Sequence, residues 1–232
     1  MSALEFITLP VETPSPTRTF HRGHYVCHEG RARYTAFLAR QIASVSKGPI
    51  LDVGCGVGHL LSTLADLRIP ATGFDLAHEA VERAREDPRT KVTQHDANES
   101  WPFTDESFDV VTMFDVIEHF IEYSRALDEA RRVLHANGHL FVVTVNRMSI
   151  LRWLLGSAWG ALKDPEHVVY FDRPMLRGAL RKAEFAVEEV RTFFNFGIAG
   201  ESADLLRSFR FPGVMVFCPE FGDSIYVRAR KD

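Results

Sequence analysis

Short apolar runs alternate with helical segments along most of this chain, and this alternation limits the fold more than any other feature. The apolar runs occupy residues 50–53, 71–74, 108–114 and 140–145, and residues 91–94 are a further strand candidate. Between them, apolar residues recur at the three- or four-residue spacing of amphipathic helices. Apolar strands separated by helices are typical of a parallel sheet that helices cover on both faces. We therefore expect a doubly wound α/β fold.

The regular alternation ends after Asn146. Residues 146–171 contain Trp153, Trp159 and several leucines, and they do not resemble another short crossover. We expect an insertion here, and three roles are open to it: a lid that excludes water from a site, a packed core segment, or an oligomer contact.

The rest of the chain completes one expected domain, residues 1–232. Its first twenty residues carry three prolines and little periodicity, so residues 1–30 are expected to form a loose arm. Asn137-Gly138 is expected to end the helix that precedes the fifth strand. The elements expected after the insertion are a helix at 174–182 and strands at 185–192 and 224–229.

Composition and charge limit the partners of the chain. Its 46% hydrophobic and 25% charged residues are ordinary for a globular protein, and its net charge of −4 gives no support for a nucleic-acid partner. The three cysteines form no C-x-x-C pair, which fits a reducing compartment. We see neither a signal peptide nor an apolar run of about 18 residues that could span a membrane. We expect a cytoplasmic protein without a membrane span, with a homodimer as one candidate assembly.

A glycine-rich turn follows the first apolar run, in the sequence LDVGCGVG of residues 51–58. Gly54 and Gly56 allow a tight turn and a close approach of a ligand to the backbone. The spacing G-x-G-x-G differs from the G-x-G-x-x-G of dinucleotide folds. Asp52 lies two positions before the first glycine, which suits a cationic group better than a pyrophosphate.

Two further acidic residues follow the next two strands. Asp75 ends the second strand, where a carboxylate can accept both hydroxyls of a ribose. Asp96 follows the third strand, where it could accept an exocyclic adenine amine. In a parallel sheet, Asp52, Asp75 and Asp96 would all lie at the ligand-binding carboxyl edge.

These motifs together resemble a known family. LDVGCGVG, GFDLAHEAVERARE, HDANE and FDVVTMFDVIEHF are similar, in order and spacing, to the motif series of class I S-adenosylmethionine-dependent methyltransferases, in the ubiquinone-type and small-molecule branch. The resemblance runs from about Arg31 to Val145, and HVVYFDRPMLRGALRKAEFAVEEV resembles a later segment of that family. It implies a seven-stranded, mostly parallel sheet with an antiparallel last strand.

The resemblance also implies roles for single residues. Gly54, Cys55 and Gly56 would run along the methionine part of the cofactor, with Asp52 near its amino group. Asp75 would hold the ribose, with Leu76 beside the adenine. The remaining residues that the resemblance places around the cofactor are Asp96 and Ala97 at the adenine, Phe114 and Asp115 near the sulfonium, and Arg33 at the carboxylate.

His119 is the first candidate for catalysis, because imidazole titrates near neutral pH and a base is needed when an acceptor must lose a proton. A second interpretation comes from ubiquinone-type relatives, in which an acidic-x-x-Glu-His pattern can hold a divalent cation. Asp115, Glu118 and His119 match that pattern, with Asp at the first position. A third is purely structural, with Glu118 and His119 capping the next helix and packing the cofactor loop. His167 could face the acceptor or could tie the insertion to the sheet.

Several functions stay open at this point. The resemblance implies methyl transfer from S-adenosylmethionine to a small molecule, with oxygen as the first choice of acceptor atom and nitrogen or carbon as alternatives. The glycine spacing counts against an NAD-dependent oxidoreductase. The absence of an Asn/Asp-Pro-Pro-aromatic motif after the fourth strand counts against a nucleic-acid amino-methyltransferase. A module that binds the cofactor without catalysis is the remaining alternative.

Overall fold

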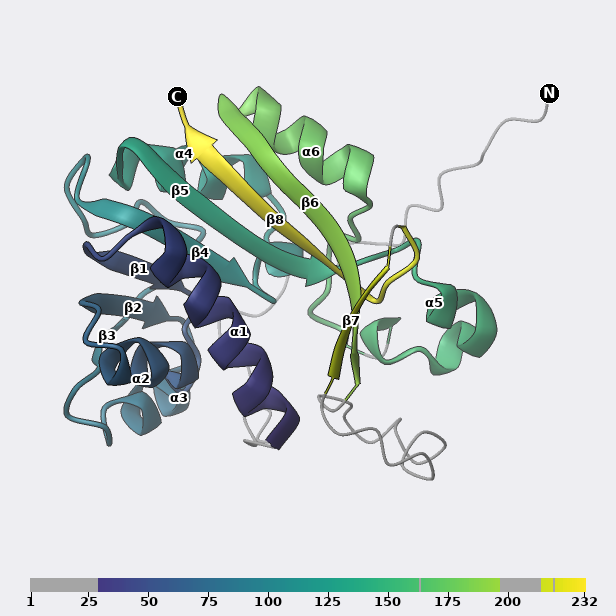
Figure 1. Ribbon diagram of the computed structural model, residues 1–232, viewed down its shortest axis with the longest axis horizontal. Helices are drawn as coiled ribbons and strands as arrows, with labels where there is room; N and C mark the ends of the chain where they lie inside the picture. The colour runs from purple at the N-terminus through teal and green to yellow at the C-terminus, as the bar shows by residue number, and fades with distance from the viewer. Residues whose placement is uncertain (1–28, 163, 197–213, 219) are drawn as a thin grey trace.

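Eight strands form one sheet in the order β3-β2-β1-β4-β5-β8-β6-β7 (Figure 1). The computed structural model describes residues 29–162, 164–196, 214–218 and 220–232. The strands are β1 (Ile50–Val53), β2 (Ala71–Asp75), β3 (Lys91–Gln94), β4 (Phe108–Phe114), β5 (Leu134–Val145), β6 (Phe185–Phe196), β7 (Val214–Cys218) and β8 (Ser224–Lys231).

The strand directions confirm the predicted doubly wound fold. Strands β1 to β5 pair in parallel, and β8 lies antiparallel to both β5 and β6. Thus the last strand of the chain is antiparallel, as predicted. The sheet has one strand more than expected, because β7 pairs with the end of β6 as an antiparallel edge strand.

Helices cover both faces of this sheet (Figure 1). They are α1 (Glu29–Val45), α2 (His59–Asp66), α3 (His78–Ala84), α4 (Tyr123–Val133), α5 (Ile150–Leu155) and α6 (Arg173–Lys182), with short 3-10 turns η2 (Ile117–His119), η3 (Gly156–Ala158) and η4 (Gly160–Leu162). Helices α1 and α2 pack with Val110 and Phe141 on one face, whereas α4 and α6 pack with Val111 and Val142 on the other. Neighbouring residues of β4 and β5 therefore face opposite layers, as the two-residue period of a strand requires.

The expected helix stop at Asn137-Gly138 is wrong. Helix α4 already ends at Val133, and β5 begins at Leu134. The register between β4 and β5 shifts after Leu134, and Asn137 has a φ of +64°. Asn137 and Gly138 thus absorb an irregularity inside the strand instead of ending the helix.

The insertion 146–171 consists of α5, the two 3-10 turns η3 and η4, and a stretch that returns to the sheet through a bridge between Asn146 and Phe171. Trp159 is buried and donates from Nε1 to Asp223 Oδ1 at 2.7 Å. Of the predicted arm 1–30, residues 1–28 lie outside the described residues. Among the helices described, none is both long and apolar enough to cross a bilayer.

Candidate active site

The glycine turn after β1 lies against two other strand ends. Gly54 and Gly56 have φ of +67° and +53°, a region that side chains rarely adopt. The amide of Gly54 donates to Phe74 O at the end of β2. A Cβ on Gly54 would lie 2.5 Å from Cγ2 of Val116, in the loop after β4. The carboxyl ends of β1, β2 and β4 therefore meet at this turn.

Asp75 closes the turn with both carboxylate oxygens. Oδ2 accepts from the Gly56 amide and Oδ1 from the Ala77 amide, each at 2.8 Å. A carboxylate has about four acceptor positions, so these two bonds leave capacity for the hydroxyls of a ribose. Leu76, the predicted adenine neighbour, is half-buried beside it, and its carbonyl accepts from Gln94 Nε2.

Asp52 lies at the base of the turn and is almost completely buried. Thr112 Oγ1 donates to its Oδ1 at 2.6 Å. The pKa of Asp52 is raised to about 7, mainly by burial; the Thr112 bond lowers it in part, and the nearby Asp75 carboxylate adds a smaller increase. Burial also raises the pKa of the Cys55 thiol. A cation placed beside Asp52 would favour its ionised form.

Asp96 and Ala97 begin the loop between β3 and β4. Asp96 Oδ1 accepts from the amide and the side chain of Asn98, both at 2.9 Å. Ala97 is buried, and its carbonyl accepts from Trp101 Nε1. The predicted adenine-binding pair thus sits in a loop with its own internal bonds.

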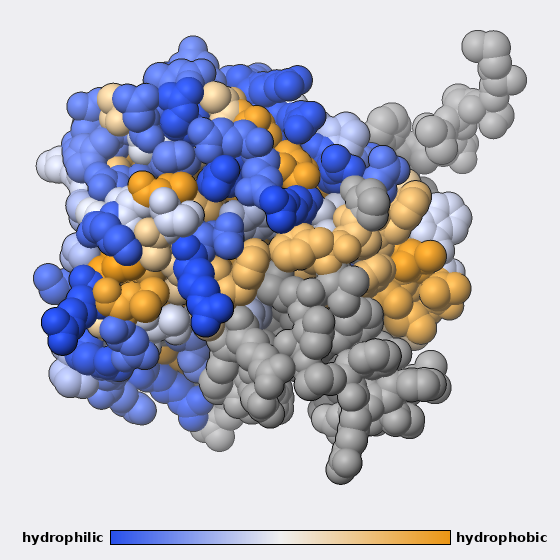
Figure 2. All heavy atoms as spheres, viewed as in Figure 1, coloured by the Kyte–Doolittle hydropathy of each residue, from blue (hydrophilic) through white to orange (hydrophobic). Residues whose placement is uncertain are grey.

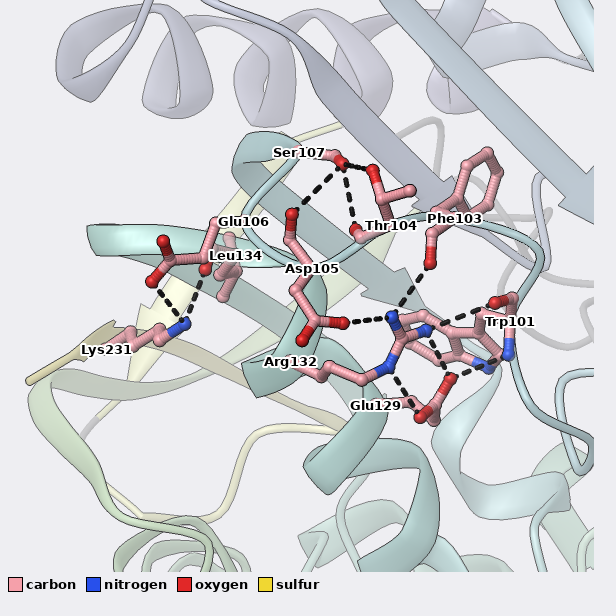
Figure 3. Close-up of polar contacts among 10 residues, drawn as sticks. All are labelled: Trp101, Phe103, Thr104, Asp105, Glu106, Ser107, Glu129, Arg132, Leu134 and Lys231. Carbon is pink, nitrogen blue, oxygen red and sulfur yellow. Dashed lines mark hydrogen bonds and ion pairs between the residues drawn. The ribbon is translucent and has the colours of Figure 1, made fainter.

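Arg132 of α4 anchors this loop, and the sequence analysis missed it (Figure 3). Its guanidinium forms a two-pronged ion pair with Glu129 and donates to the carbonyls of Trp101 and Phe103 at 3.1 and 2.8 Å. Glu129 in turn accepts from the Trp101 amide at 2.6 Å. Nothing in the sequence pattern separates Arg132 from other arginines, because the carbonyls to which it donates lie about thirty residues earlier in the chain.

A buried carboxyl follows β4. Phe114 is half-buried at the end of the strand, and Asp115 is exposed with a φ of +55°. Glu118, in η2, is fully buried, and its Oε2 accepts from Thr144 Oγ1 at 2.9 Å. Its Oε1 has no hydrogen-bond partner among the described residues. Burial, together with the nearby Asp115 carboxylate, raises the pKa of Glu118 to about 8.

His119 and His167 come together beside Glu118, although they lie far apart in the sequence. The Glu118 carbonyl accepts from the amides of Val168 and Val169, which holds the end of the insertion against η2. The two imidazole rings lie 4.9 Å apart. His119 Nδ1 lies 3.0 Å from Glu166 O, and His167 Nδ1 lies 2.9 Å from Ala161 O.

These contacts define the tautomer of each ring. Because a carbonyl oxygen only accepts, each Nδ1 carries the proton and each neutral ring keeps its lone pair on Nε2. Asp164 Oδ2 lies 3.6 Å from His167 Nε2, at ion-pairing distance for a protonated ring. Both predicted catalytic histidines therefore belong to one cluster.

Glu118, His119 and His167 also form a group that could hold a metal ion. One ligand atom from each lies within 4.8 Å of the others. Among the described residues this group includes His167 and leaves out Asp115, which the sequence analysis had placed in the ligand set. The sequence could not suggest His167 as a ligand, because only the fold brings the insertion to η2.

Arg33 belongs to α1, but its side chain lies outside the described residues. A depression of about 590 Å³ lies elsewhere, over β6 and β8. Its lining residues are Gln41, Arg177, Glu188, Glu189, Val190, Arg191 and Arg228. The charges there pair with one another, as in Arg228 with Glu188, so this depression does not compete with the strand-end site.

Comparison with known proteins agrees with this geometry. A family model described as a methyltransferase domain matches residues 25–190. The chain belongs to this family. Over 116 residues, this methyltransferase-family chain is 39% identical to "Ubiquinone biosynthesis O-methyltransferase, mitochondrial" of Candida albicans, a match that covers 46% of the chain and 35% of that protein. It is 34% identical over 113 residues to "Ubiquinone biosynthesis O-methyltransferase" of Hydrogenovibrio crunogenus, covering 47% of each.

These matches thus span less than half the length of those relatives. Solved structures extend the likeness over most of the methyltransferase-family chain. A SAM-dependent methyltransferase from Thermotoga maritima superposes with a TM-score of 0.64 at 23% identity, covering 88% of this chain and 91% of that one. One from Archaeoglobus fulgidus gives 0.63 at 16% identity, covering 86% and 94%. At these identities the likeness establishes the fold.

Proposed function

We propose that the protein is an S-adenosylmethionine-dependent methyltransferase that methylates an oxygen atom of a small molecule. The observation that carries this proposal is the cluster of Glu118, His119 and His167. It lies just after β4, in and beside the loop whose Val116 packs against Gly54 of the glycine turn. Such a cluster offers proton-accepting groups where an acceptor would meet the cofactor. An oxygen acceptor is the case in which proton removal helps most.

The strand-end residues fit S-adenosylmethionine. Asp75 offers two carboxylate oxygens to ribose hydroxyls, and buried Asp52 offers a carboxylate to the cationic amino group. The positive φ of Gly54 and Gly56 lets the backbone turn close to the methionine part. When bound, the cofactor supplies an electrophilic methyl group on a sulfonium.

His119 is the proposed base. Its Nδ1–H donates to Glu166 O, so the lone pair on Nε2 can take the proton of an acceptor hydroxyl. His167 is held by Ala161 O and lies beside Asp164, which would stabilise a positive charge shared by the two rings. We assign His167 to positioning the acceptor and supporting this charge.

Glu118 acts as a neutral donor in this scheme. With a pKa raised to about 8 the carboxyl is mostly protonated at neutral pH, and Thr144 donates to Oε2, which leaves Oε1 to carry the proton. Because Oε1 is buried, it can then donate only within the cluster, whose imidazole nitrogens lie within 4.8 Å of a carboxylate oxygen of Glu118. Glu118→Gln preserves such a donor and should retain most of the activity.

The test is transfer of radiolabelled methyl from S-adenosylmethionine to a panel of phenols and catechols. His119→Ala should lower kcat by about 10²–10⁴, the usual contribution of general base catalysis, with affinity for S-adenosylhomocysteine unchanged. His135→Ala is the matched control, because His135, half-exposed at the start of β5, pairs with Asp109 of β4 at the amino ends of these strands, away from the proposed site. Equal losses of kcat and cofactor affinity would instead assign His119 to the cofactor loop.

A divalent cation at Glu118, His119 and His167 is the second candidate. It is favoured by the buried Oε1 without a partner and by the backbone carbonyls that orient both rings, a common support for metal-binding histidines. It predicts the opposite behaviour of Glu118→Gln, which would remove the anionic ligand and most of the activity. Loss of activity in EDTA, restored by Mn²⁺ or Zn²⁺, would establish this candidate.

A further inference from the structure

The three tryptophans of the chain differ in what surrounds them. Trp153 of α5 is 77% exposed, at the end of the molecule where Figure 2 shows hydrophobic residues gathered over this helix. Trp101 and Trp159 are both buried, and each donates a hydrogen bond from its indole N–H. Trp159 bonds Asp223 in the turn before β8, whereas Trp101 bonds the Ala97 carbonyl at 3.2 Å. Trp101 is therefore the tryptophan that can act on the loop assigned to adenine.

The bond from Trp101 fixes one end of the peptide unit between Ala97 and Asn98. At the other end, the Asn98 N–H donates to Asp96 Oδ1 at 2.9 Å, and the Asn98 side chain donates to the same oxygen. Because a peptide unit is planar, the direction of its carbonyl sets the direction of its N–H. Both bonds to the Asp96 carboxyl use Oδ1, and Oδ2 accepts from no donor among the described residues. Oδ2 is thus the oxygen left for an exocyclic amine.

Trp101 is itself held by Glu129 and Arg132 of α4 (Figure 3). Glu129 Oε2 accepts from the Trp101 amide at 2.6 Å, and Arg132 Nη2 donates to the Trp101 carbonyl at 3.1 Å. The indole ring lies at a steep angle to Phe74, the residue before Asp75, with 5.5 Å between the ring centroids. Backbone and ring of Trp101 are both fixed, so its N–H can hold the loop in one arrangement.

We propose that Trp101 is a positioning residue that sets the preference of the site for an adenine base. Its buried side chain acts through the peptide unit between Ala97 and Asn98, which keeps Asp96 Oδ2 available to the exocyclic amine. The inference rests on the proposed cofactor, S-adenosylmethionine, and adds how this chain would distinguish its base. A base with a carbonyl in place of the amine would set one acceptor against another, and sites built for a donor reject such analogues.

Isothermal titration with two ligands tests the proposal. They are S-adenosylhomocysteine and S-inosylhomocysteine, in which a carbonyl oxygen replaces the exocyclic amine. The parent should bind S-adenosylhomocysteine at least about tenfold more tightly, because only this ligand donates to the Asp96 carboxylate. Trp101→Phe keeps an aromatic ring and removes the N–H. It should bind S-adenosylhomocysteine about tenfold more weakly and change the affinity for S-inosylhomocysteine by less than about threefold, so that the preference is lost.

Trp159→Phe is the matched control. It makes the same substitution at another buried tryptophan and also removes one indole hydrogen bond, here to Asp223, so both dissociation constants should stay unchanged. The Asp96→Ala background tests the route of the effect. Because it removes the carboxylate through which Trp101 acts, Trp101→Phe should there change the affinity for S-adenosylhomocysteine by less than about threefold.

Glu129→Ala is a second variant, for the case that Trp101→Phe does not fold. It keeps the Trp101 ring and removes the acceptor of its amide, so the preference for S-adenosylhomocysteine should fall in the same direction. Thermal unfolding of each variant reports on its fold. Equal weakening of both ligands by Trp101→Phe, or additive losses in the Asp96→Ala background, would overturn the proposal, because Trp101 would then only support the fold.

Failure of this inference is distinguishable from failure of the proposed function. Tight binding of S-adenosylhomocysteine with an unchanged preference in Trp101→Phe would overturn the role of Trp101 alone. Absence of S-adenosylhomocysteine binding by the parent would overturn the proposed cofactor and this inference together.

Discussion

Three glycines make different demands on the fold, and alanine at each should change stability in a different way. Gly54 and Gly156 both have positive φ, +67° and +53°. Such a backbone costs a non-glycine residue about 1–3 kcal/mol. A Cβ at Gly54 would also lie 2.5 Å from Val116 Cγ2, whereas a Cβ at Gly156 would meet nothing within 4 Å. Overpacking adds about 1–3 kcal/mol, so Gly54→Ala should cost about 2–6 kcal/mol and Gly156→Ala only the backbone share.

At Gly178, alanine should raise stability instead of lowering it. This glycine lies inside α6 with open space around its Cα, so Gly178→Ala should stabilise the protein by about 0.5–1 kcal/mol. Equilibrium urea unfolding of the three variants measures these differences.

The steric part of the Gly54 effect can be isolated. Val116→Ala shortens the side chain that a Cβ at position 54 would meet, so Gly54→Ala should cost less in that background. Costs that simply add in the double variant would refute the steric argument. A Gly156→Ala cost equal to that of Gly54→Ala would refute it as well.

Three further predictions concern buried polar groups. The raised pKa of Asp52 means that the folded state holds its proton more tightly, so its contribution to stability is full below about pH 4 and falls as the pH rises to about 7. Asp52→Asn should flatten the fall in unfolding free energy between pH 4 and 8, by up to about 4 kcal/mol, and an unchanged slope would contradict the burial argument. Arg132→Gln should lower the unfolding free energy by about 1–3 kcal/mol in urea melts, because two loop carbonyls and Glu129 lose their partner, and no loss would mean that water replaces these bonds. Trp159→Phe should cost about 1 kcal/mol or more for the lost bond to Asp223, while Trp153→Phe, at an exposed site, should leave the melting curve unchanged; equal costs would contradict their different burial.

Local pattern predicted most of the sheet. The strand at 108–114 can be predicted because its residues alternate between two helical layers, which makes most of them apolar. The edge strand β7 was not predicted, since its place depends on pairing with the end of β6. Asn137-Gly138 does not end a helix, because the residues that favour helix ends also fit an irregular strand.

The sequence also predicts only part of the candidate site. The glycine turn and Asp75 follow directly from motifs near consecutive strand ends. The meeting of His119 with His167 does not, because it depends on the path of the insertion and on the bonds from Val168 and Val169 to Glu118 O. Trp153 and Trp159 are six residues apart and alike in sequence context, yet only Trp159 reaches Asp223, so their burial could not be told apart beforehand.

The most direct test of the central claim is isothermal titration of the purified protein with S-adenosylhomocysteine. Binding at one site is expected, unchanged by EDTA and at least about tenfold weaker in Asp75→Ala, which removes the carboxylate assigned to the ribose. NAD should give no heat of binding. No binding of S-adenosylhomocysteine, or binding of NAD in its place, would contradict the assignment of the glycine turn and of every residue placed around it.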